Sequence, residues 1–185
     1  MAASPGQSPT PQQQPAGSGA NPRPAAIAMA VGNVVCAVGL FLGFLRLSDG
    51  GDEAIKPVAL LSVGAMGIVS FVRHAVLHRS DAARMKWDIG RTDNFQIEVG
   101  MANLAWGVVA VMSVLGGWGT AAQGAVTAVF GLYLLMAAAI HVRILLIGPV
   151  EERRPLSSVI PTVMIGSLLT FFAVLAFVDA NASPF

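Results

Sequence analysis

Residues 99–142 read VGMANLAWGVVAVMSVLGGWGTAAQGAVTAVFGLYLLMAAAIHV and contain no Lys, Arg, Asp or Glu. A helix that crosses a bilayer needs about 20 apolar residues, so this run is long enough for two helices. The segment GGWGT at Gly116–Thr120 is the expected turn between them. Three more charge-free runs occupy residues 24–45, 57–72 and 155–178. We therefore predict five spans, at roughly 25–46, 57–78, 97–116, 121–146 and 157–178.

The composition of the whole chain agrees with a membrane protein. Of its 185 residues, 55% are hydrophobic and 11% are charged, and the mean hydropathy is +0.68. An ordinary soluble domain carries roughly 25% charged residues, which it needs to cover its core. We predict an all-α integral membrane helical bundle. The net charge of +1 offers no field for a nucleic-acid partner, and the single Cys excludes an internal disulfide.

Two segments qualify this simple pattern. Residues 1–24 consist mainly of Pro, Gln, Gly, Ser and Ala and carry one charge, Arg23. This composition predicts a disordered cytoplasmic tail before a bundle at residues 25–180. The second apolar run is short. It reaches spanning length only if its helix continues through Arg73, His74 and His78.

The positions of the basic residues predict the orientation. With a cytoplasmic N-terminus, all but two of the eleven Lys and Arg fall on the cytoplasmic side, and the exceptions are Arg46 and Lys56. Such a bias is typical of bacterial inner-membrane proteins. We expect a multi-pass protein of the plasma membrane with its N-terminus inside and its C-terminus outside.

Small residues recur at helical spacing in the first three spans. They form three stripes, which are Gly32, Cys36, Gly39 and Gly43; Gly67, Ser70 and His74; and Gln96, Gly100, Asn103 and Gly107. Helices in a membrane associate through such residues, so the stripes are expected to face the bundle interior. The same faces could hold a homo-oligomer or a larger membrane complex together.

Ionisable residues gather near the expected cytoplasmic ends of spans two to four. The candidate polar pocket consists of His74, His78, Glu98, Asn103 and His141. On one continuous helix His74 and His78 would face the same way, as two metal ligands must, and Glu98 and His141 could complete a site for zinc or non-haem iron. The other interpretations are a pocket that handles protons or a ligand, and histidines with a structural or interfacial role.

The loop between spans two and three is the most charged part of the chain. Four basic residues alternate with acids there, and they are Arg79, Arg84, Lys86 and Arg91. Such alternation is typical of a solvated surface with salt bridges. The segment Ser80–Lys86 could form a short amphipathic helix near anionic lipid. Alternatively, these side chains bind a specific anionic ligand.

The segment that begins span three resembles a known family. Its pattern consists of Phe95, Gln96, Glu98, Gly100, Asn103 and Gly107. It is similar to a pattern in small uncharacterised bacterial multi-pass membrane proteins, broadly those like the DoxX group. The resemblance implies a four-helix bundle and, for some members, a link to redox complexes that use a quinone. This chain adds one span and the N-terminal tail.

The sequence contains no GxGxxG, Walker A, HExxH, GxSxG or CxxCH motif. We therefore expect an accessory or ligand-binding membrane component rather than an enzyme. Its polar site is expected at the cytoplasmic ends of spans two to four. One alternative is a membrane oxidoreductase or isomerase that uses a His/Glu metal site or a pocket for a lipophilic substrate. The other is an oligomeric transporter or channel component with Glu98 as a proton or cation site.

Overall fold

The computed structural model describes residues 20–85, 89–148 and 156–182, and within these ranges it contains helices and no strands. Of the predicted tail at 1–24, residues 1–19 lie outside the described residues. The elements in chain order are α1 (Arg23–Leu45), the 3-10 turn η1 (Leu47–Asp49), α2 (Gly51–Pro57), the π-helix η2 (Val58–Ala65), α3 (Met66–Phe71), the π-helix η3 (Val72–Val76), α4 (His78–Met85), α5 (Ile89–Leu115), α6 (Thr120–Ile147) and α7 (Leu156–Ala182).

Five helical stretches are long and apolar enough to cross a membrane, which confirms the predicted fold class. They are Arg23–Leu45, Gly51–Val76, Asn94–Leu115, Thr120–Ile147 and Val159–Ala182. The predicted turn at Gly116–Thr120 is confirmed, because Gly117 and Gly119 have φ values of 62° and 86° there, a conformation that favours glycine. The second span begins six residues earlier than the predicted residue 57, because α2 starts at Gly51 and continues through Lys56 and Pro57.

The second span ends before His78, which corrects one part of the prediction. The π-helix η3 closes with a hydrogen bond from Leu77 N–H to the Val72 carbonyl, at 2.8 Å. Leu77 then leaves the helical conformation, with φ −98° and ψ 24°. His78 therefore begins the separate helix α4, and the argument that His74 and His78 share a face of one helix is wrong. The expected short helix near Ser80–Lys86 is confirmed as α4.

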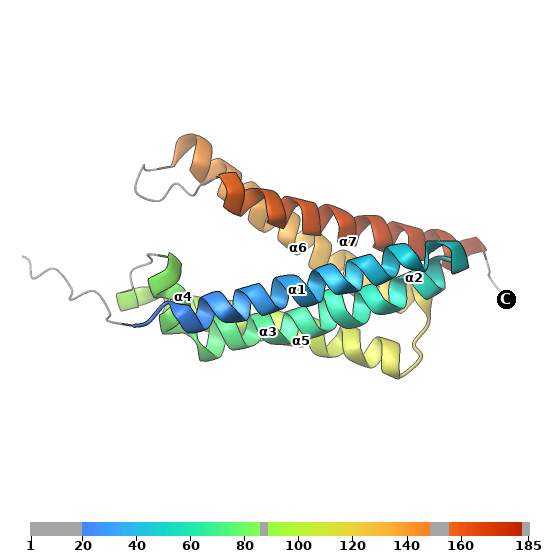
Figure 1. The fold of residues 1–185 in the computed structure, drawn as a ribbon, viewed down its shortest axis with the longest axis horizontal. Coiled ribbons are helices and arrows are strands. Elements are labelled where there is room, and N and C mark those ends of the chain that lie inside the picture. Colours follow the sequence, from blue (N-terminus) through green and yellow to red (C-terminus); the bar gives the residue numbers. More distant parts are fainter. Residues whose placement is uncertain (1–19, 86–88, 149–155, 183–185) are drawn as a thin grey trace, which may run out of the picture.

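The bundle has two parts that separate toward one end. Helices α6 and α7 pack along each other, and they contact the rest mainly through α2, η2 and α5. Figure 1 shows this pair moving away from α1 and α3 toward the end that carries α4, and approaching them at the end that carries α2. We call these the α4 end and the α2 end. The positions of the basic residues predict that the α4 end lies on the cytoplasmic side.

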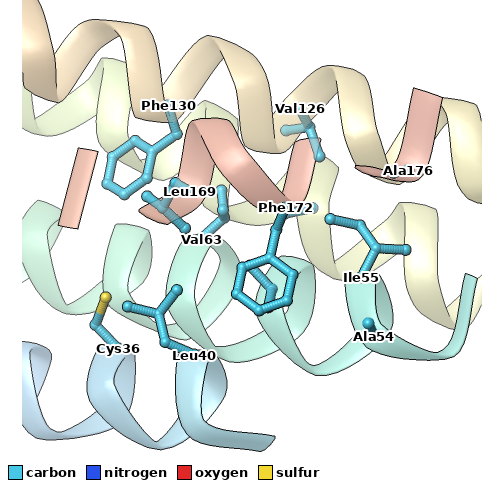
Figure 2. Close-up of a cluster of buried hydrophobic side chains, with 12 residues drawn as sticks. Cys36, Leu40, Ala54, Ile55, Val63, Val126, Phe130, Leu169, Phe172 and Ala176 are labelled. Carbon is cyan, nitrogen blue, oxygen red and sulfur yellow. The ribbon is translucent and has the colours of Figure 1, made fainter. Parts of the chain in front are cut away.

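The hydrophobic core lies where the two parts meet. Its fully buried members include Ile55 of α2, Val63 of η2 and Phe172 of α7. Figure 2 shows these side chains pointing toward one another between the helices. The core therefore joins α6 and α7 to the second span at the α2 end, and their other halves lack such a connection.

The small-residue stripes are used inside the chain. Gly32, Gly39 and Gly43 of α1 are buried. Gly67 of α3 faces the backbone of α5 at Gly107. The structure thus places the predicted packing faces against neighbouring helices of the same chain, where the backbones come close.

Asp179, near the end of α7, connects α7 to the start of α2. Its Oδ2 accepts hydrogen bonds from the backbone N–H groups of Gly51 and Asp52, at 2.5 and 3.2 Å. These are free donors of the first turn of α2, so Asp179 caps that helix from a distant part of the chain. We expect Asp179→Ala to lower the free energy of unfolding by about 1 kcal/mol, measured by thermal unfolding in detergent.

Asn181→Ala is the matched control for this prediction. Asn181 is exposed and its side chain donates only to the Phe177 carbonyl of its own helix, at 2.8 Å. We expect a change within about 0.5 kcal/mol. Equal destabilisation by the two substitutions would show that Asp179 contributes no cap.

Candidate polar centre and groove at the α4 end

Asp81 in the first turn of α4 is the centre of a group of buried charges. Its side chain is 0% exposed. Oδ1 accepts two hydrogen bonds from Arg84, whose Nε and Nη2 lie at 3.0 and 2.9 Å. Oδ2 lies 3.0 Å from Nδ1 of His74 and 3.9 Å from Nε of Arg73. One carboxylate therefore joins α4 to η3.

The ring of His74 lies between a cation and an anion. Nη2 of Arg73 contacts Nε2 of His74, and a guanidinium nitrogen can only donate. We therefore assign the ring proton to Nδ1, the atom that faces Asp81. His74 is then neutral, and the attraction within the group comes from Arg73 and Arg84 acting on Asp81.

These neighbours decide the charge state of Asp81. Burial by itself raises the pKa of this carboxyl group, but the contact with His74 and the charges of Arg73 and Arg84 outweigh it. The pKa of Asp81 therefore lies below its usual range. The carboxylate stays ionised at neutral pH and holds α4 against the end of the second span.

Ser80 adds a second connection, to the start of α1. Its hydroxyl donates to the Asn21 carbonyl at 2.6 Å and accepts from the Ala25 N–H at 3.1 Å. Together Ser80 and Asp81 bind α4 to both α1 and η3. The polar centre therefore closes the α4 end of the first two spans.

The other residues of the predicted pocket have different surroundings in the structure. Glu98 is exposed on α5. His78 makes its ring contact with the Ala75 carbonyl, 3.0 Å from Nδ1. Asn103 is buried, donates to the Val99 carbonyl at 2.7 Å and interacts with Tyr133 of α6. His141 is half-buried on α6.

The proposed metal set is not assembled. In the part of the chain that the structure describes, no three or more His, Cys, Asp or Glu side chains group in a way that could hold a metal ion. His74, His78, Glu98 and His141 all belong to that part. Of these four, His74 alone belongs to the centre around Asp81.

The basic residues of the predicted loop have different surroundings. Arg84 is engaged by Asp81, and Arg79 is exposed on α4. Lys86 lies outside the described residues, and so does the side chain of Arg91. The sequence interpretation missed Asp81, although its spacing of three residues from Arg84 is a helical ion-pair spacing and could have indicated it.

A second feature, also missed by the sequence interpretation, is a groove on α6 at the α4 end. It has a volume of about 500 Å³. Its lining consists of Leu135, Ala138, Ala139, Val142, Arg143, Leu146, Ile147 and Val163. Arg143 is the one charged member. Its side chain is exposed, and Arg143 forms no ion pair or hydrogen bond with any of the described residues.

Comparison with known proteins identifies a family for nearly the whole bundle. The model of a family described as "Family of unknown function (DUF6790)" matches residues 25–183, and the chain belongs to this family. No curated protein and no solved structure matches the chain. The resemblance to the DoxX group stays a prediction.

Proposed function

We propose that this member of the DUF6790 family is a ligand-binding membrane protein, and that its ligand is a lipid with a negatively charged headgroup. The site is the groove beside Arg143. The observation that carries the proposal is the position of this cation, which lines an otherwise apolar groove and has no counter-charge among the described residues. An ionisable residue in a membrane span is by default a candidate for function.

The length of the groove matches one leaflet of a bilayer. Its lining on α6 extends from Leu135 to Ile147, about 18 Å along the axis at roughly 1.5 Å per residue. Half of a hydrocarbon core is about 15 Å thick. An acyl chain can therefore lie along the groove within a single leaflet.

The depth of Arg143 matches a headgroup. Arg143 is four residues from the end of α6 at Ile147, about 6 Å along the helix axis. A guanidinium at this depth reaches the phosphate level of the membrane and can bind phosphate with two parallel hydrogen bonds. The acyl chain and the headgroup of one lipid thus find complementary surfaces on the same helix.

The test compares Arg143→Gln with Arg79→Gln. Arg79 is also exposed at the α4 end, but it lies on α4 and does not line the groove. Each protein is purified in mild detergent from the same membranes, and native mass spectrometry measures the ratio of anionic to zwitterionic lipid that stays bound. We expect Arg143→Gln to lower this ratio at least about tenfold, as expected for the loss of a charged hydrogen bond, and Arg79→Gln to leave it unchanged.

A second variant tests the groove itself. Ala139→Phe keeps Arg143 and fills the apolar part of the groove, where Ala139 is exposed. It should also release the lipid while the thermal unfolding temperature stays that of the wild type. If both groove variants keep the anionic lipid, or if Arg79→Gln loses as much of it as they do, the lipid is held by general charge attraction. Either result would overturn the proposal.

A further inference from the structure

Asn33 places a polar side chain in the apolar middle of α1. It follows the start of this helix at Arg23 by ten residues, about 15 Å at roughly 1.5 Å per residue. The hydrocarbon core is about 30 Å thick, so Asn33 lies near its centre. The side chain is exposed and makes no hydrogen bond among the described residues.

An amide in hydrocarbon without a hydrogen-bond partner is unfavourable. Its transfer from water to an apolar medium costs several kcal/mol when no hydrogen bond replaces those to water. Asn side chains in membrane spans therefore favour contact with another helix that offers a donor or an acceptor. Ser70 and Arg73 line the same small hollow as Asn33, but neither bonds to it.

Apart from the small hollow that Asn33 shares with α3 and η3, the face of α1 that carries it is exposed at Ala30, Asn33 and Ala37. Asn33 precedes Phe44 by eleven residues, about three turns, so the two share a face. Phe44 contacts Phe172 of α7 at the α2 end, with ring centroids 4.9 Å apart. Three turns closer to the α4 end, α7 has moved away from α1 (Figure 1).

We propose that this face binds α1 of a second copy of the chain, and that the two Asn33 carboxamides hydrogen bond to each other. Two copies inserted with the same orientation have parallel α1 helices, which brings both Asn33 side chains to the same depth. A carboxamide both donates and accepts, so it is complementary to itself. Ala30 and Ala37 flank Asn33 on this face, are exposed and allow close approach of the two backbones.

The other face of α1 cannot serve this purpose. Gly39 and Gly43 form a GxxxG pair, a pattern that often joins membrane helices. In this chain they are occupied, because a Cβ at Gly39 would meet Leu61 and one at Gly43 would meet Phe172. The interface between copies is therefore centred on Asn33 and not on the glycine motif.

Cysteine cross-linking in native membranes tests the interface. The background variant is Cys36→Ala, since Cys36 is the single and buried cysteine. Two single cysteines are compared in this background. Ala30→Cys lies on the proposed face. Val31→Cys lies at nearly the same depth, where Val31 is 47% exposed, but it is rotated by about 100° around the helix axis from Ala30. We expect mild oxidation to give a dimer with Ala30→Cys and at most a trace with Val31→Cys.

Asn33 is tested in the same background and by an independent measurement. Adding Asn33→Leu to Ala30→Cys should lower the cross-linked fraction about three- to tenfold, and Asn33→Gln should restore part of it. Energy transfer between labelled copies in vesicles should fall with lipid dilution sooner for Asn33→Leu than for the wild type. Equal cross-linking at positions 30 and 31, no effect of Asn33→Leu, monomers at every dilution, or cross-links only to another protein would each overturn the proposal.

Discussion

Asp81→Ala is expected to lower the free energy of unfolding by about 3 kcal/mol. Removal of one member of a buried ion pair typically costs about 3–5 kcal/mol, because the remaining charge loses its partner. The lower end applies here, since the side chains of Arg73 and Arg84 are 20% and 21% exposed and can reach some water. Thermal unfolding of the purified protein in detergent measures the change.

Asp81→Asn and Asp49→Ala separate charge from shape. Asp81→Asn keeps the size of the side chain and should be nearly as unstable as Asp81→Ala. Asp49 is a matched acid whose side chain is 51% exposed, 4.0 Å from Arg46, and its loss should cost at most about 1 kcal/mol. A stable Asp81→Asn would show that packing, and not charge, holds α4 in place.

The same group predicts how stability depends on pH. The folded pKa of Asp81 is lowered, so its contribution is fully present above the unfolded pKa, about 3.9. That contribution is lost as the pH falls from there through the lower folded pKa. Between pH 7 and pH 3, Asp81→Asn should therefore lose less stability than the wild type, as followed by the unfolding temperature. Parallel curves for the two proteins would contradict this assignment.

The sequence predicts the spans well because their signal is composition. Apolar length requires no knowledge of tertiary contacts, and the turn at Gly116–Thr120 is marked by its glycines. Where the prediction failed, backbone geometry decided. No residue pattern marks the π-helix η3 or the break at Leu77, and the spacing of His74 and His78 is informative only on one uninterrupted helix.

The candidate site was harder to predict because burial is a tertiary property. Asp81 lies among alternating charges that are typical of a solvated surface, yet its contacts with His74 and Arg84 bury it completely. Glu98 lies in an apolar helix and was predicted as a member of the polar pocket, but its side chain is exposed on α5. The distribution of charge along the sequence therefore indicated the end of the bundle where the buried charges lie, but it pointed to Glu98 and not to Asp81.

The close approach of α3 and α5 predicts the second large effect, at Gly67. A Cβ on Gly67 would lie 2.7 Å from the Asn103 carbonyl oxygen and 2.9 Å from Cα of Gly107. Both neighbours are backbone atoms, so neither can rotate away and the two helices must separate. We expect Gly67→Ala to cost about 3 kcal/mol, the upper part of the usual range for overpacking, and Gly67→Val to prevent recovery of folded protein.

Gly32→Ala distinguishes this steric effect from a general effect of glycine replacement. Gly32 is buried in α1, but a Cβ there would meet Cγ1 of Val69 at 3.5 Å, an ordinary contact with a side chain. Alanine favours a helix over glycine by up to about 1 kcal/mol, so Gly32→Ala should leave stability unchanged or raise it. If Gly67→Ala lowers stability and Gly32→Ala does not, the direct backbone contact between α3 and α5 requires glycine at position 67. Equal unfolding temperatures for the two variants would contradict this explanation.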